Sequence, residues 1–189
     1  MKKIEHQFKK EDFYRPKWKI KHLFIGTFNP TGGEKVNYYY GRERNRTWEL
    51  LSKIFKEELN PKDKDFLKKL KKHGIACVDI IDTIKADEKK ISQILGKGYK
   101  DSSIINKSVI REYNTEQISK IIDSNQNLKV YSTWGKGATL SEWKKETAKV
   151  QNRIALVSPS MAARVPKGQK KFEYMLEDWK GKITFANTV

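Results

Sequence analysis

The stretch His22-Leu23-Phe24-Ile25-Gly26-Thr27-Phe28-Asn29-Pro30 decides the fold class of this chain. It begins as a short apolar run that favours extended structure and ends in an Asn-Pro turn. Three further runs of the same kind follow, at residues 75–81, 128–133 and 153–157. Each run is bounded by polar, Gly or Pro residues, and together they predict four buried β-strands.

Segments with helical periodicity separate these runs. Apolar residues spaced three and four positions apart predict helices at about residues 45–57, 114–122, 140–147 and 172–179. The second of these begins at Asn114, and Gln117 follows at the spacing of a capping box. Strands that alternate with helices form right-handed βαβ units. We therefore predict an α/β fold with three α/β/α layers around a central, mainly parallel four-stranded sheet.

Two segments carry weaker signals. The lysine-rich run at residues 62–72 predicts a solvated helix whose Phe66, Leu67 and Leu70 face the core. Residues 82–110 contain weak helix signals followed by a glycine turn, so they indicate no definite element.

The length and composition predict one domain. The chain has 189 residues, of which 37% are hydrophobic, and we find no internal repeat or linker. We expect a single domain over residues 1–189, with residues 1–20 as a basic N-terminal extension. No apolar run approaches the roughly 18 residues of a membrane span, and the N-terminus lacks the apolar core of a secretory signal. A cytoplasmic protein without membrane contact is expected.

The charge is strongly positive. The chain carries 40 Lys and Arg against 23 Asp and Glu, a formal net charge of +17. Polyanions such as nucleic acids are natural partners for such a protein. The lysines are spread along the whole chain, however, so charge alone does not separate a nucleic-acid-binding protein from a lysine-rich protein of another kind.

The loops after the predicted strands are the places to look for a site, because ligands bind at the carboxyl ends of strands in open parallel sheets. Asn29 precedes a proline, which favours an extended or turn conformation and lets its carboxamide point across the sheet end. Residues 38–48 combine three consecutive Tyr with three Arg, a pattern that suits base stacking and phosphate contact. If Tyr38 and Tyr39 only pack, their hydroxyl groups are expected to reach solvent.

Several chemistries are poorly supported. The only cysteine, Cys77, rules out an intrachain disulfide and a multi-cysteine metal site. None of the three His lies in the strand-end loops, so a Ser-His-Asp hydrolase is not indicated. There is no Walker phosphate loop and no cluster with metal-ligand spacing. Asp79 and Asp82 form one weak Mg²⁺-binding pair, so we expect neither a metal nor a cofactor.

Three motifs in order resemble the uracil-DNA glycosylase superfamily. They are residues 23–30 (LFIGTFNP), 39–48 (YYGRERNRTW) and 156–160 (LVSPS). The mismatch-specific thymine/uracil and hypoxanthine branches are the most similar, and Asn29 falls on the Asn of the former branch's Gly-x-Asn-Pro motif. Residues 75–81 and 100–104 resemble the hypoxanthine branch, so the likeness spans most of residues 20–180.

The resemblance implies a monofunctional DNA glycosylase. Such an enzyme hydrolyses the N-glycosidic bond of a deaminated or mismatched base, uracil or hypoxanthine, acting as a monomer on DNA without a cofactor. It implies that Asn29 or Asn45 orients the attacking water and that Phe28, Tyr40 and Ser158 contact the base. The residues that it implies for DNA contact are Arg42, Arg44, Arg46, Ser160, Met161, Arg164 and Lys167.

Departures from the family pattern lie in the first and last motifs. Thr27-Phe28 stands where the mismatch-specific branch has Gly-Ile. Ser158 stands where other branches carry His or Asn. Ala162 stands at the position of a leucine wedge and is too small to fill the gap left by an extruded base, which leaves Met161 or Arg164 for that task.

Two functions from other classes stay open at this point. One is a non-catalytic nucleic-acid-binding domain on the same fold, which binds DNA or RNA but releases no base. The other is an Mg²⁺-dependent nucleotide or nucleic-acid hydrolase that uses Asp79 and Asp82.

Overall fold

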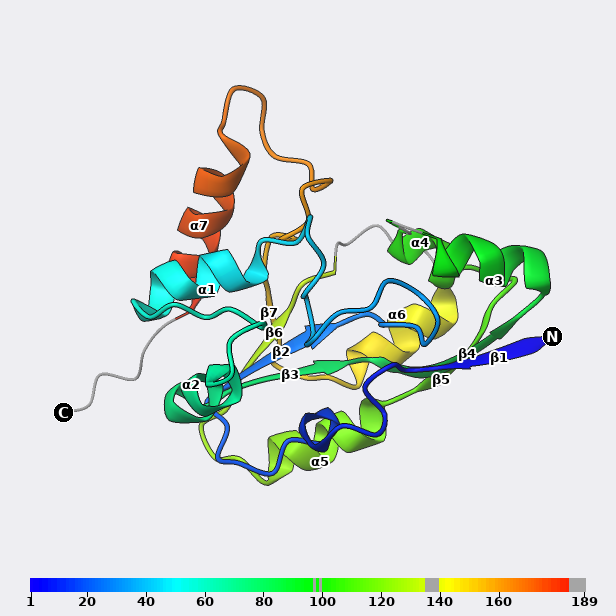
Figure 1. The fold of residues 1–189 in the computed structure, drawn as a ribbon, viewed down its shortest axis with the longest axis horizontal. Helices are drawn as coiled ribbons and strands as arrows, with labels where there is room; N and C mark the ends of the chain where they lie inside the picture. The colour runs from blue at the N-terminus through cyan, green and yellow to red at the C-terminus, as the bar shows by residue number, and fades with distance from the viewer. Residues whose placement is uncertain (97, 99, 135–139, 184–189) are drawn as a thin grey trace.

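The computed structural model describes residues 1–96, 98, 100–134 and 140–183. The end of the predicted domain, residues 184–189, lies outside this description. The central sheet has the order β3 (Ile75–Asp79), β2 (His22–Gly26), β6 (Lys129–Ser132) and β7 (Ile154–Ala155), and every neighbouring pair is parallel (Figure 1). The four predicted strands and the mainly parallel four-stranded sheet are confirmed, but β7 has only two residues and is not buried as expected.

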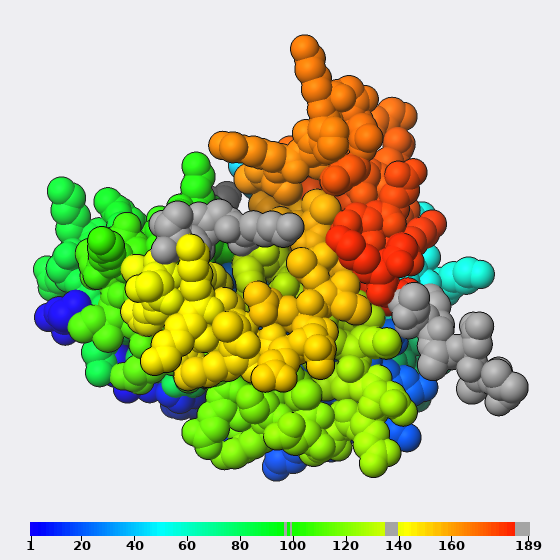
Figure 2. All heavy atoms as spheres, turned by 180° about the vertical axis from the view of Figure 1, so that it is seen from behind, coloured from blue at the N-terminus to red at the C-terminus, as the bar shows by residue number. Residues whose placement is uncertain are grey.

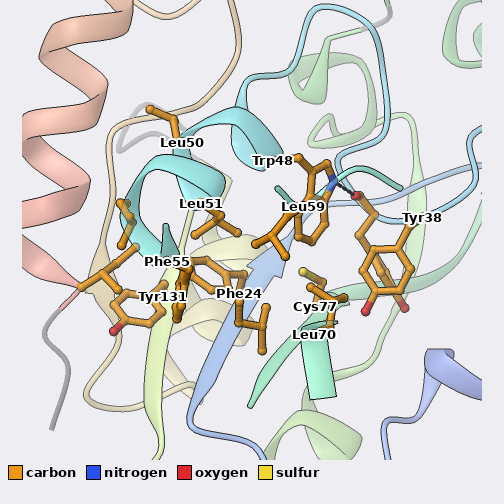
Figure 3. Close-up of a cluster of buried hydrophobic side chains, with 14 of the residues drawn as sticks. Phe24, Tyr38, Trp48, Leu50, Leu51, Phe55, Leu59, Leu70, Cys77 and Tyr131 are labelled. Carbon is orange, nitrogen blue, oxygen red and sulfur yellow. Dashed lines mark hydrogen bonds between the residues drawn. The ribbon is translucent and has the colours of Figure 1, made fainter. Parts of the chain in front are cut away.

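Helices cover both faces of this sheet because side chains alternate along each strand. On one face, Phe24, Cys77 and Tyr131 belong to one buried cluster, part of which is drawn in Figure 3. The helices in that cluster are α1 (Thr47–Phe55), α2 (Phe66–His73) and α7 (Lys171–Lys182).

The opposite face buries Leu23, Ile25 and Val130 in a second cluster. The helices in that cluster are α3 (Glu88–Leu95), α4 (Asp101–Ile104), α5 (Thr115–Asp123) and α6 (Ser141–Ala148). The three α/β/α layers are therefore also confirmed. The helix predicted for residues 62–72 is α2, which begins only at Phe66; Phe66 and Leu70 are buried as expected, and Leu67 is partly buried.

A second sheet was not predicted. It is antiparallel, with the order β1 (Lys2–Glu5), β4 (Ile81–Ala86) and β5 (Ile110–Tyr113). The apolar run at 75–81 is thus two strands, since β3 ends at Asp79 and β4 begins at Ile81. A register shift between Ile81 and Thr83 interrupts the regular alternation of β4, which explains why the sequence pattern did not indicate a strand.

The start of α5 also differs from the sequence prediction. Asn114 makes no side-chain capping bond to the helix. Its Nδ2 instead donates to the backbone oxygen of Asp79 over 3.3 Å. The asparagine therefore joins the start of α5 to the end of β3, where the functional loops begin.

Residues 1–20, the expected basic N-terminal extension, are packed onto the domain. β1 pairs with β4, and the chain continues through a short 3₁₀ helix at Asp12–Tyr14. Lys9 Nζ lies 2.8 Å from Asp82 Oδ2, and the Tyr14 hydroxyl donates to Asp82 Oδ1 over 2.5 Å. Burial disfavours ionised Asp82, but the bonds from Lys9 and Tyr14 outweigh it and lower the pKa of this carboxyl.

Within the described part of the chain, no helix is long and apolar enough to cross a membrane.

His22, at the start of β2, makes folding stability depend on pH. Its Nδ1 lies 3.2 Å from the Tyr131 hydroxyl, and burial, aided by the nearby Lys21, lowers its pKa to about 4. An unfolded histidine titrates near pKa 6.5. The unfolded state therefore binds the proton first, so stability is full above about pH 6.5 and falls as the pH drops towards 4.

We expect His22→Asn, which keeps a polar group near Nδ1, to flatten this pH dependence. Between pH 6.5 and 5 the wild type should lose about 1–2 kcal/mol more unfolding free energy than the variant. Urea unfolding at several pH values measures the difference. Equal pH slopes for the two proteins would show that His22 is not responsible.

Candidate functional site

A pocket of about 430 Å³ opens at the carboxyl edge of the parallel sheet. Its walls come from the loop after β2, the Tyr- and Arg-rich segment, the end of β3, the turn before α4, Thr133 after β6, and the loop after β7. The predicted site residues that line it are Phe28, Asn29, Tyr40, Arg42, Arg44, Asn45, Ser158 and Ser160. The pocket therefore brings together residues from all three motifs.

Four of the predicted residues do not line the pocket. Arg46 pairs with Glu49 over 2.9 Å, and its Nε donates to the Met161 sulfur over 3.4 Å. Arg164 and Lys167 are exposed and belong to the segment between β7 and α7. This segment projects beyond the rest of the molecule (Figure 2, orange), so these cations stand outside the pocket.

Backbone bonds join the second and third motifs into one wall. Asn45 and Ser160 form an antiparallel bridge. Arg46 N donates to the Pro159 oxygen over 2.9 Å, and Met161 N donates to the Arg44 oxygen over 3.0 Å. Two segments far apart in the sequence are thus held in fixed register beside the pocket.

The carboxamide of Asn45 is oriented by its own helix. Its Oδ1 accepts the backbone N–H of Thr47 over 2.9 Å, an arrangement typical of an Asx turn. With the oxygen engaged in this way, the group that Asn45 can offer to the pocket is its Nδ2, a donor.

Asn29 has the opposite orientation. Its Nδ2 donates to Asp79 Oδ2 over 2.7 Å. A carboxylate only accepts hydrogen bonds, so this contact determines which end of the amide faces Asp79. Asn29 therefore has Oδ1, an acceptor, to offer to the pocket that it lines.

Asp79 is also bound by His6, a residue that the sequence analysis left out. His6 Nε2 lies 2.8 Å from the same Asp79 oxygen, and its Nδ1 accepts the backbone N–H of Phe8 over 3.1 Å. Because Nδ1 accepts, the proton sits on Nε2 and the imidazole is neutral. The pairing of β1 with β4 brings His6 here, and no local motif around His6 indicated it.

Tyr40 forms part of the pocket wall in a constrained conformation. Its backbone is left-handed, with φ of 57°, which is uncommon for a residue other than glycine. Its hydroxyl lies 3.2 Å from Thr133 Oγ1, and burial raises its pKa well above the usual value, so it stays protonated. Tyr38 and Tyr39 are fully buried in the core, so the expectation that their hydroxyls reach solvent is wrong.

A second carboxyl group, Asp101, also lines the pocket. It accepts the Thr27 hydroxyl over 3.0 Å. Asp101 is exposed as a residue, yet the protein around its carboxyl raises the pKa of this group, while the Thr27 bond and the charge of Arg42 act in the other direction.

Asp79 and Asp82 do not form a joint site. Asp79 binds His6 and Asn29 in the pocket, whereas Asp82 binds Lys9, Tyr14 and Thr83 and does not line it. Among the described residues, no group of three or more His, Cys, Asp or Glu side chains is arranged to hold a metal ion. These contacts favour a structural role for Asp82.

No protein-family model matches this sequence, and no significant match was found among curated proteins or among solved structures.

Gly26 makes the close approach of the pocket groups possible. A Cβ at this position would lie 2.3 Å from Asp79 Oδ1 and 3.1 Å from the Tyr40 hydroxyl. The first distance is far inside van der Waals contact, so an alanine must displace the Asp79 carboxylate.

We expect Gly26→Ala to lower the unfolding free energy by about 1–3 kcal/mol, as overpacking does in a dense interior. Gly181→Ala is the matched control, since nothing lies within 4 Å of its Cβ position in α7. That substitution should leave stability unchanged or raise it by up to about 1 kcal/mol. Chemical unfolding compares the two, and a Gly26→Ala protein as stable as the control would contradict the crowding argument.

Proposed function

We propose that this protein is a DNA glycosylase that hydrolyses the N-glycosidic bond of uracil or hypoxanthine drawn into the pocket. The observation that carries the proposal is the convergence of Asn29, Tyr40, Asn45 and Ser158 on one pocket at the carboxyl edge of the sheet. The resemblance of the three motifs to the uracil-DNA glycosylase superfamily supplies the reaction class. We further propose that it acts as a cytoplasmic monomer.

The reaction makes three demands on the site. The enzyme must extrude the base from the stack, which costs a few kcal/mol and least at a mismatched or damaged base. It must stabilise negative charge on the departing base. It must also hold a water beside C1′, where positive charge develops on the sugar.

The size and lining of the pocket suit an extruded base. Its volume of about 430 Å³ lies within the range of small-molecule sites. Tyr40 and Phe28 provide aromatic walls against which a base can stack. The Asn45 Nδ2 and the Ser158 hydroxyl are donors that can face the negative charge of the leaving base, and such a donor contributes roughly 3–4 kcal/mol to the transition state.

The orientation of the two asparagines separates their roles. A water that attacks C1′ must be held by an acceptor, so that its own lone pair points at carbon. Asn29 has its Oδ1 for this purpose, whereas the Oδ1 of Asn45 is bound to Thr47. We therefore assign the water to Asn29 and the leaving base to Asn45.

The proposal predicts base release without an added metal. Duplexes containing uracil, hypoxanthine or xanthine, incubated with and without EDTA, should lose one of these bases at equal rates in both conditions. Asn29→Ala and Asn45→Ala should each lower the single-turnover rate on that base by about 100-fold or more. The excised base is measured by chromatography.

Each other outcome points to a different protein. Tight DNA binding without release of any base indicates a binding domain, and activity that EDTA abolishes indicates a metal-dependent hydrolase. If both asparagine variants keep the wild-type rate, the assignment of the site is wrong.

The positive residues beside the pocket should bind the DNA backbone. Arg44 lines the pocket and is exposed, and Arg164 stands on the projecting segment. Arg44→Ala and Arg164→Ala should each weaken duplex binding and lower the salt slope of the affinity by about one. Fluorescence anisotropy at several salt concentrations measures both quantities.

Lys68→Ala is the control for these variants. Lys68 is an exposed residue of α2. This helix leads into the start of β3, and so it approaches the edge of the sheet opposite the pocket. Loss of the Lys68 charge should leave the affinity and salt slope close to the wild-type values. An equal effect of all three substitutions would show that binding is not localised at the pocket.

A further inference from the structure

The proposed reaction needs a proton acceptor for the attacking water, and none of the pocket residues assigned so far can serve as one. A carboxamide such as that of Asn29 can orient a water, but it is too weak a base to take the proton that the water loses. The hydroxyls of Tyr40 and Ser158 are equally unsuited at neutral pH. Two carboxyl groups line the pocket, Asp79 and Asp101.

Asp79 is the carboxyl in direct contact with the water-holding residue. Its Oδ2 accepts from both Asn29 and His6. Its Oδ1 lies directly above Gly26, on the side of the Tyr40 hydroxyl, and accepts no hydrogen bond from the described residues. A water held by Asn29 Oδ1 therefore lies next to a carboxylate with a vacant oxygen.

His6 holds this carboxylate in place. The imidazole is enclosed by the rings of Phe8, Tyr14, Phe28 and Tyr39, with ring centroids 5.1 to 5.6 Å away. Both of its nitrogens are occupied, one by the Phe8 amide and the other by Asp79. The ring is thus fixed and donates one hydrogen bond to Oδ2, which directs Oδ1 away from itself.

We propose that Asp79 is the proton acceptor of the reaction and that His6 is its positioning residue. The water oxygen forms the new bond to C1′, and the electron pair of the broken C1′–N bond leaves with the base. One proton of the water passes to Asp79 Oδ1, which becomes a neutral carboxyl. That proton then returns to the departed base or to solvent. This inference rests on the proposed glycosylase function.

Asp101 is the competing acceptor. It bonds to Thr27 rather than to Asn29, so nothing in its contacts couples it to the water. A comparison of Asp79 and Asp101 variants therefore decides between the two carboxyls.

The test measures single-turnover base release with enzyme in excess, on the substrate that the wild type cleaves best. Asp79→Asn keeps an oxygen that can accept from Asn29 and His6 but removes the base, and its rate should fall by about 100-fold or more. The rate of Asp101→Asn should stay within about tenfold of the wild-type rate, because loss of a pocket contact slows the reaction less than loss of the proton acceptor.

Asp82→Asn is the matched control. Asp82 lies three residues along the chain and also accepts several side-chain hydrogen bonds, from Lys9, Tyr14 and Thr83, but outside the pocket. This variant should unfold more easily and yet release base at close to the wild-type rate. It separates loss of the acceptor from general loss of stability.

Chemical rescue distinguishes a proton acceptor from a residue that only supports the structure. Formate added to Asp79→Ala should occupy the vacated space and restore part of the rate in proportion to its concentration, while leaving Asp82→Asn unaffected.

His6→Ala should slow release about tenfold with unchanged DNA affinity, and His6→Gln, which keeps a donor, should recover part of that loss. Combined with Asp79→Asn, His6→Ala should have no further effect, since it acts through Asp79.

The outcomes are distinguishable. A wild-type protein that releases no base overturns the proposed function itself. If the wild type releases base and Asp79→Asn releases it equally fast, this inference alone is overturned. A slow Asp101→Asn beside a fast Asp79→Asn assigns the proton to Asp101. Thermal unfolding of each variant confirms that the rates belong to folded protein.

Discussion

The pairing of β2 with a parallel strand on each side is the constraint on which the site depends. Its register places Gly26 opposite Asp79 on one side and Ile25 opposite Ser132 on the other. The three strands therefore end together, and their loops leave the sheet at one edge. A shift of β2 by one residue would exchange the two buried faces and would also separate Gly26 from Asp79.

The second sheet brings a side chain, His6, to this edge that the parallel sheet does not contain. β4 continues from β3 after a single residue, and β1 pairs along it in antiparallel register. The chain leaving β1 then passes the end of β3, where His6 contacts Asp79. The N-terminal segment thus lies behind the pocket rather than in its lining, and it reaches the pocket through the contact of His6 with Asp79.

Much of this architecture follows from local patterns, and the rest does not. The four parallel strands and most of their covering helices are visible as short apolar runs and helical repeats, and Asn29, Tyr40, Asn45 and Ser158 follow from motif order. The helices α3 and α4 were not predicted, because residues 82–110 carry only weak helical signals. The second sheet was not predicted, because β1 is short and charged and a register shift breaks the alternation of β4. His6 could not be found, since only long-range strand pairing brings it to Asp79.

The contacts that complete the pocket have consequences for how the protein matures. His6 and Asp79 are 73 positions apart, and the contact between Arg46 and Met161 spans 115. Contacts of such long sequence separation form late, because the intervening chain must first be ordered. The pocket therefore needs the chain from His6 to Met161, since no shorter stretch contains both contacts. An intact pocket is therefore a stricter sign of complete folding than helix content is.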